Sequence, residues 1–124
     1  MRKINLNNNK SLVFNINDYV IKKIKLVFLK INVDDESFIF PGKINTEENK
    51  IEVDIPILKE NISKKTGKLF LYVITIDETE YKFLEDDIIF FYGSSLVNNS
   101  QFGNKNEINL NEKGLNLIPA TKNN

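Results

Sequence analysis

The side chains that could carry out chemistry in this chain are mainly carboxylates, because its 124 residues include no histidine and no cysteine. Histidine is the commonest general base and metal ligand, and cysteine supplies thiol nucleophiles and thiolate ligands. Without them the usual nucleophile–base pairs cannot form. The five glycines also fall in no phosphate-loop or dinucleotide-binding spacing. The sequence therefore predicts a protein that is not an enzyme and that uses no cofactor.

The carboxylates gather in three short clusters, each in a predicted turn: residues 34–36, 77–80 and 85–87. If two of these turns met at one end of a sheet, they could bind Ca²⁺, which takes about six to eight oxygen ligands. No EF-hand spacing is present, and a glycosidase would also need a cleft with aromatic subsites. Three tyrosines, Tyr72, Tyr81 and Tyr92, could form a sugar platform, although strand tyrosines usually pack with the ring buried.

The charge pattern argues against nucleic acid and against a membrane. The chain has 17 basic and 17 acidic side chains, and Arg2 is its one arginine. A polyanion binder needs a surplus of positive charge. The densest lysine run, Lys22, Lys23 and Lys25, would lie on both faces of a strand and so form no single patch. No apolar run approaches the roughly 18 residues of a membrane span, and the start has no leader-like apolar segment. We expect a cytoplasmic protein.

The elements that must position these groups are predicted to be strands. Alanine is almost absent, and isoleucine, phenylalanine, valine and tyrosine are frequent, which favours a pleated sheet. Short apolar runs are separated by turn signals at intervals of about 8–12 residues, which indicates a single antiparallel β-sandwich of about seven strands. The predicted strands are residues 11–16, 20–33, 37–40, 50–57, 68–77, 80–84 and 87–92.

Three boundaries in this prediction depend on particular residues. Residues 20–33 also carry apolar side chains at helical spacing, so a helix is the alternative there, but β-branched residues favour a strand. Pro41-Gly42 is a strong turn dipeptide and should end the strand at residue 40. Glu85-Asp86 should separate the last two strands. In residues 50–57 apolar and polar side chains alternate strictly, which indicates a strand with one buried and one solvent-exposed face.

Three of the strands are apolar on both faces: residues 26–29, 69–76 and 88–91. A sheet of such strands would expose a large apolar patch on one side unless something covered it. The candidates for that cover are the C-terminal segment, residues 58–67 or another subunit. This alternation predicts an interaction surface.

The two ends of the chain are predicted to be extended arms, residues 1–10 and 93–124, around a domain at residues 11–92. The C-terminal arm is rich in polar residues and buries little by itself. Residues 107–111 and 115–118 alternate, and Ile-Asn-Leu-Asn occurs both at 4–7 and at 108–111. These stretches could add strands to a sheet edge, although composition alone could also produce them. The expected partner-binding anchors are Ile108, Leu110, Leu115, Leu117 and Ile118.

The region from Phe38 to Tyr92 resembles small virion-associated β-sandwich proteins of tailed bacteriophages. The resemblance lies in the order of Phe-Ile-Phe-Pro-Gly-Lys-Ile, Ile-Glu-Val-Asp-Ile-Pro-Ile-Leu-Lys, Gly-Lys-Leu-Phe-Leu-Tyr-Val-Ile and Glu-Tyr-Lys-Phe. It covers less than half of the chain and includes no defining motif, so no functional residue is carried over. It implies a capsid or head accessory component, made in the host cytoplasm and located in the virion.

The residues and the resemblance together predict a non-enzymatic structural or assembly protein. It would bind neighbouring protein subunits, with homo-oligomers among the possibilities, through its sheet face and its C-terminal arm. The alternative is a small ligand-binding β-sandwich module that binds carbohydrate or depends on Ca²⁺ and uses its acidic loops.

Overall fold

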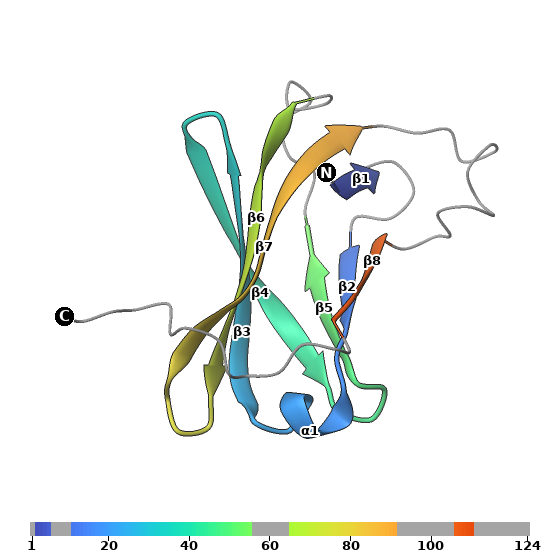
Figure 1. Ribbon diagram of the computed structural model, residues 1–124, viewed down its shortest axis with the longest axis vertical. Helices are drawn as coiled ribbons and strands as arrows, with labels where there is room; N and C mark the ends of the chain where they lie inside the picture. Colours follow the sequence, from blue (N-terminus) through green and yellow to red (C-terminus); the bar gives the residue numbers. More distant parts are fainter. Residues whose placement is uncertain (1, 6–10, 56–64, 92–105, 111–124) are drawn as a thin grey trace.

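The computed structural model describes residues 2–5, 11–55, 65–91 and 106–110, and its elements are almost entirely β strands (Figure 1). In chain order they are β1 (Arg2–Asn5), β2 (Ser11–Asn15), α1 (Asp18–Ile21), β3 (Ile24–Val33), β4 (Glu36–Asn45), β5 (Lys50–Asp54), β6 (Thr66–Thr75), β7 (Glu80–Phe91) and β8 (Asn106–Asn109). The prediction of an all-β protein is confirmed. No helix in the described ranges is long and apolar enough to cross a membrane.

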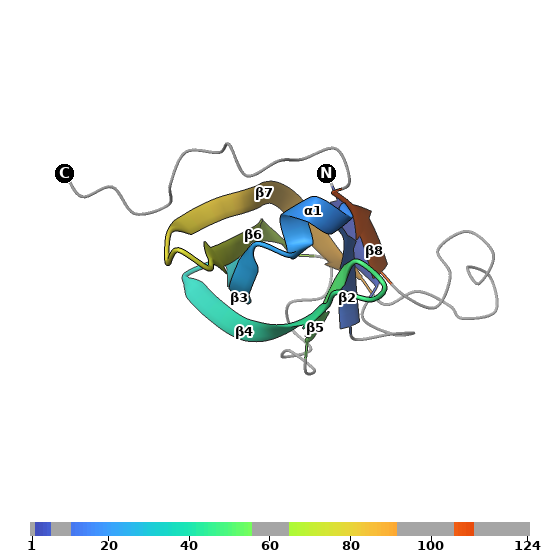
Figure 2. The same ribbon diagram turned by 90° about the horizontal axis from the view of Figure 1, so that it is seen from below.

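The strands form one eight-stranded sheet in the order β1-β7-β6-β3-β4-β5-β2-β8. Seen from below, this sheet curls around a central core into a half-barrel (Figure 2). The pairings are antiparallel except at the two edges, where β1 runs parallel to β7 and β8 runs parallel to β2. The expected antiparallel sandwich of about seven strands is therefore corrected to a mixed, curled sheet. The two parallel edge strands come from the predicted arms, whose pairing is non-local and leaves little signal in the sequence.

The curl depends on β4, which changes its partner halfway along. Residues up to Pro41 pair with β3, and residues from Gly42 onwards pair with β5. A β-carbon at Gly42 would lie 2.7 Å from Val27 Cγ1, so any larger residue here would require the Val27 side chain to move. The prediction that Pro41-Gly42 ends the strand is wrong. Proline lacks an N–H donor, and here it occupies the bend between two partners.

The prediction of a break at Glu85-Asp86 is also wrong, because β7 is a single strand of 12 residues. Its register with β6 shifts between Leu71 and Tyr72, so that consecutive residues Phe83 and Leu84 are both buried. Such a bulge bends a strand without ending it. Of the acidic residues that follow, Glu85 is paired with Lys82 and Lys68 on the outward face, and Asp86 is paired with Arg2 of β1.

The stretch predicted as one strand from residue 20 begins with a helical turn instead. Asn17 caps α1, and its side-chain oxygen accepts a hydrogen bond from the Val20 N–H at 3.1 Å. Val20 and Ile21 are buried there, and the strand proper starts at Ile24. The helix α1 ends at Ile21, so the helical alternative for residues 20–33 is not found, and the strand interpretation holds for residues 24–33.

The core lies inside the curl and is a single cluster of aliphatic and phenylalanine side chains. Strand β5 shows how alternation fills it: Ile51, Val53 and Ile55 are buried, while Asp54 is exposed. This confirms the half-buried strand predicted there, although residues 56 and 57 lie outside the described ranges. Both edge strands also contribute to the core, through Ile4 on β1 and Ile108 on β8. The turns predicted at residues 34–36 and 77–80 lie where β3 joins β4 and where β6 joins β7, and both pairs of strands are antiparallel.

Candidate binding surface on the outer face of the sheet

The candidate site is the convex face of β4, β3, β6 and β7, which points away from the core. In β3 the inward positions from Val27 onwards are buried, and the outward positions between them are half-buried. Strand β6 alternates in the same way. The register places Pro41, Phe28 and Tyr72 in one row across the sheet, and Ile39, Lys30 and Phe70 in the next. We call the outward residues Leu26, Phe28, Ile39, Pro41, Phe70, Tyr72 and Ile74 the apolar face.

Three aromatic rings form the centre of the apolar face. The ring centroids of Phe28 and Tyr72 lie 5.1 Å apart with an interplanar angle of 22°, and those of Phe70 and Tyr72 lie 6.1 Å apart at 20°. The Lys30 ammonium lies 6.0 Å from the centroid of the Phe70 ring. Tyr72 thus stacks with both phenylalanine rings, and the three rings form one continuous aromatic surface.

Two large aliphatic side chains at the margin of the apolar face remain in solvent. Leu26 is 54% exposed and Ile39 is 63% exposed. The predicted tyrosine platform does not form, because Tyr72 lies on the outer face while Tyr81 packs against the core from the inner face. Tyr92 lies outside the described residues. The prediction of an apolar second face is therefore supported by the burial pattern, with phenylalanines rather than tyrosines as its main aromatic members.

The charges on this face are divided between its two halves. The β4 and β3 half carries Lys43 and Lys30 and no outward carboxylate, as the register places them. The β6 and β7 half carries three outward carboxylates (Glu80, Glu85 and Asp87) and two lysines (Lys68 and Lys82). Within β4 and β3 the outward charges are therefore positive, and within β6 and β7 they are net negative. Lys43 also has an outward carboxylate beside it, because its register partner on β5 is Glu52.

Glu85 is the centre of a small ion-pair network in the β6 and β7 half. Its carboxylate accepts hydrogen bonds from Lys82 at 2.6 Å and from Lys68 at 3.3 Å. These contacts, that of Lys82 first, lower the pKa of the Glu85 carboxyl. The hydrogen bond to Glu85 and its negative charge raise the pKa of the Lys82 ammonium. All three groups are solvent-exposed, so the network contributes little stability and mainly fixes the local charge pattern.

The acidic turns do not meet. The β3–β4 turn containing Asp34 and the β6–β7 turn containing Asp77 and Glu78 lie at opposite ends of the sheet (Figure 1). Each is already paired: Lys65 with Asp34 at 2.8 Å, and Lys25 with Glu78 at 3.2 Å. No group of three potential metal ligands occurs among the described residues. The geometry required for a shared Ca²⁺ site is therefore not present in these turns.

The basic run beside α1 is equally dispersed. Lys22 and Lys23 lie in the turn after the helix rather than on a strand, and the Lys23 ammonium lies 5.5 Å from the centroid of the Tyr19 ring. Lys25 faces Glu78 in the ion pair described above. Lys23 and Lys25 therefore have different partners, an aromatic ring and a carboxylate.

The predicted anchors of the C-terminal arm have two different outcomes. Ile108 and Leu110 are each 2% exposed and belong to the chain's own core, where β8 pairs with β2. Leu115, Leu117 and Ile118 lie outside the described residues. The sequence analysis did not select Phe28, Ile39 or Phe70 as site residues. Their two-sided apolar alternation was visible, but only the strand register brings them together.

Comparisons with known proteins give no relative for this surface: no family model, curated protein or solved structure matches the chain.

Proposed function

We propose that the protein is a non-enzymatic assembly component that binds neighbouring protein subunits, copies of itself among them, through the apolar face. The observation that carries this proposal is the stacked aromatic centre with Leu26 and Ile39 exposed beside it. Contiguous apolar patches on a soluble domain commonly mark protein interfaces. Aromatic side chains are enriched at the centres of such interfaces, and charged groups are concentrated at their rims.

The charge distribution favours a second copy as the partner. In a two-fold dimer the same patch meets itself in the opposite direction, so the β4 half of one copy covers the β7 half of the other. The lysine half (Lys30 and Lys43) would then face the half that contains Glu80 and Asp87. The apolar centres of the two copies would lie against each other around the two-fold axis. Such a patch is complementary to itself in both polarity and charge.

The setting of this assembly is part of the proposal. The resemblance of residues 38–92 to virion-associated proteins of tailed bacteriophages supports a capsid or head accessory role, in which repeated copies contact one another or a shell. The separation of the acidic turns gives no comparable support to a Ca²⁺-dependent or carbohydrate-binding module.

The proposal is tested by sedimentation velocity of the purified chain from low to high micromolar concentration. We expect a dimer or larger species that the double substitution Leu26→Asp and Ile39→Asp abolishes, because it places charges at the edge of the apolar centre. Tyr19→Asp is the matched control, since Tyr19 is 59% exposed but lies on α1, away from the apolar face. A wild-type chain that stays monomeric throughout, or a double variant that associates as well as the control, would overturn the proposal.

A further inference from the structure

The strands at the two edges of the sheet end in the same residue pair, Ile4-Asn5 in β1 and Ile108-Asn109 in β8. Residues 4–7 and 108–111 are both Ile-Asn-Leu-Asn. Ile4 lies in β1 and is the register partner of Phe90 in the parallel pairing with β7. Ile108 lies in β8 and is the register partner of Phe14 in the parallel pairing with β2. All four of these side chains are buried. Each edge of the half-barrel therefore has a slot that receives an isoleucine beside a phenylalanine.

The two edge strands differ in how firmly the chain holds them. β1 is fixed by Arg2, whose guanidinium contacts the Asp86 carboxylate through Nε at 2.7 Å and Nη2 at 2.6 Å. On β8 the corresponding side-chain contact is a long hydrogen bond, 3.4 Å from Asn15 Nδ2 to Glu107 Oε1. β8 is also joined to β2 by backbone pairing, including the Leu110 N–H to the Asn15 carbonyl at 2.7 Å, and by the burial of Ile108 and Leu110 in the core. Backbone pairing of this kind does not distinguish one copy of the chain from another.

The segment that connects β8 to the rest of the sheet is also longer than the one that connects β1. Five residues connect β1 to β2, whereas fourteen residues, 92–105, connect β7 to β8. An extended chain spans at most about 3.3–3.6 Å per residue, so fourteen residues can reach roughly 50 Å. That reach exceeds the width of a domain of this size, which has a radius of gyration of about 14 Å. β8 can therefore reach the β2 edge of an adjacent copy. The five residues that follow β1 are too short for a comparable reach to the β7 edge of another copy.

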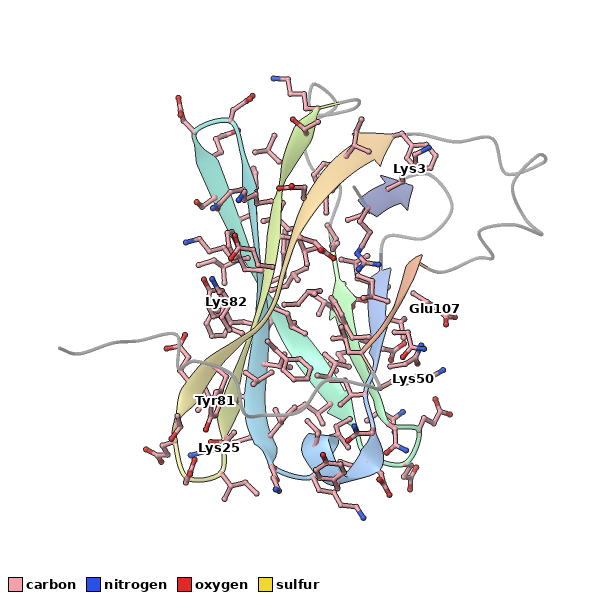
Figure 3. The ribbon with its side chains drawn as sticks, viewed as in Figure 1. Lys3, Lys25, Lys50, Tyr81, Lys82 and Glu107 are labelled. Atoms are coloured by element: carbon pink, nitrogen blue, oxygen red, sulfur yellow. The ribbon has the colours of Figure 1, made fainter. Side chains whose placement is uncertain are left out.

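We propose that the β2 edge is a recognition slot for the Ile-Asn-Leu segment of β8 from a second copy, so that copies are linked by strand exchange. Ile108 and Leu110 would fill in the neighbour the positions that they fill in their own chain. This inference deepens the proposed assembly function and rests on it, but it uses a different surface. Glu107 of β8 and Lys82 of the outer face lie on opposite sides of the molecule (Figure 3). One copy can thus use both surfaces at once.

The absence of native cysteine allows a direct test. Asn15 and Asn109 are register partners across β2 and β8, at a separation suited to a disulfide between neighbouring strands. Two full-length chains, one with Asn15→Cys and a ¹⁵N-labelled one with Asn109→Cys, are mixed at high concentration, equilibrated and oxidised. Disulfide-linked species are then separated on a non-reducing gel and assigned by intact mass. Each variant oxidised alone is the control for random coupling.

We expect the Asn15→Cys/Asn109→Cys mixed disulfide to make up a larger fraction of all disulfide-linked species than random pairing would give. We also expect this fraction to increase with the protein concentration during equilibration. A share equal to random pairing at every concentration would overturn strand exchange. Repeating the trapping with Leu26→Asp and Ile39→Asp in both chains separates the two proposals. Trapping that persists, together with sedimentation that the double substitution leaves unchanged, would leave exchange standing and remove the face. Trapping no greater than random pairing, in chains whose association the double substitution does abolish, would do the opposite.

Discussion

Replacing Gly67 with alanine should destabilise the sheet much more than the same change at Gly42. A β-carbon at residue 67 would lie 2.3 Å from the Asn32 carbonyl oxygen, which is a backbone atom of the neighbouring strand. Restoring ordinary contact requires β3 and β6 to separate by about 1 Å at this pair. Overpacking of this kind costs about 1–3 kcal/mol, and a weakened ladder hydrogen bond adds about 1 kcal/mol. Alanine also restricts the unfolded chain more than glycine does, which adds back about 0.4–1 kcal/mol to the free energy of unfolding. The expected net loss is therefore about 2–3 kcal/mol.

Gly42 provides the matched comparison, because its tightest neighbour is a side-chain atom. Val27 Cγ1 lies 2.7 Å from the added β-carbon, and two further methyl groups lie at 3.3 Å. A valine side chain can turn away at a strain of about 0.5–1.5 kcal/mol, which the gain in the unfolded chain largely offsets. Gly42→Ala should therefore cost no more than about 1 kcal/mol.

Urea unfolding followed by far-ultraviolet circular dichroism measures both variants. With a slope of about 2 kcal/mol per molar urea, Gly67→Ala should lower the midpoint by about 1 M or more, and Gly42→Ala by half of that or less. Equal midpoints for the two variants would refute the reasoning, as would a Gly67→Ala protein as stable as wild type. Either result would mean that the close approach of β6 to β3 does not require glycine.

Two further predictions concern charged groups. The Thr75 hydroxyl and the Thr79 backbone N–H donate hydrogen bonds to the Asp77 carboxylate and hold the pKa of that carboxyl below its ordinary value. The ionised Asp77 therefore stabilises the fold at neutral pH, and this stabilisation is lost as the pH falls through the folded-state pKa. Asp77→Asn should reduce the unfolding midpoint at pH 7 but not at pH 2, and an equal deficit at both pH values would contradict this. Arg2→Gln should lower the free energy of unfolding by about 1 kcal/mol at low salt, because a partly exposed ion pair is lost. It should also speed amide exchange in β1 while leaving exchange in β8 unchanged; unaltered exchange in β1 would show that the ion pair does not hold that strand.

The sequence was informative where the signal is local. Alternation identified β5 and the two-sided character of β3 and β6, and turn residues located the hairpins. It failed where tertiary pairing decides the outcome. Pro41-Gly42 is a turn signal by composition, but β4 continues through it because a second partner, β5, takes over the pairing. Glu85-Asp86 appeared to end a strand, but the lysines that make this position favourable come from β6 and from within β7 itself.

The candidate surface was predictable only in outline. Two apolar faces on the same strand implied an exposed patch. The stacking of Phe28 on Tyr72, however, depends on the register between β3 and β6, which brings together two residues that are 44 positions apart in the chain (72 − 28). The division of charge between the two halves of the face depends on the same register. Alternation in the C-terminal segment and the repeated tetrapeptide suggested added edge strands. Their parallel direction, and the equivalent placing of Ile4 beside Phe90 and of Ile108 beside Phe14, could be recognised only from the register.

A charge-reversal mixing experiment tests the central claim, self-association through the apolar face, most directly. One variant carries Lys30→Glu and Lys43→Glu, and the other carries Glu80→Lys and Asp87→Lys, which leaves Glu85 and its lysines intact. Each variant alone would place like charges opposite each other twice per dimer, whereas a mixed dimer would have opposite charges at both contacts. Sedimentation velocity should therefore show weak or no association for each variant and restored association for the mixture. A mixture that associates no better than its components, or single variants that associate like wild type, would contradict the account.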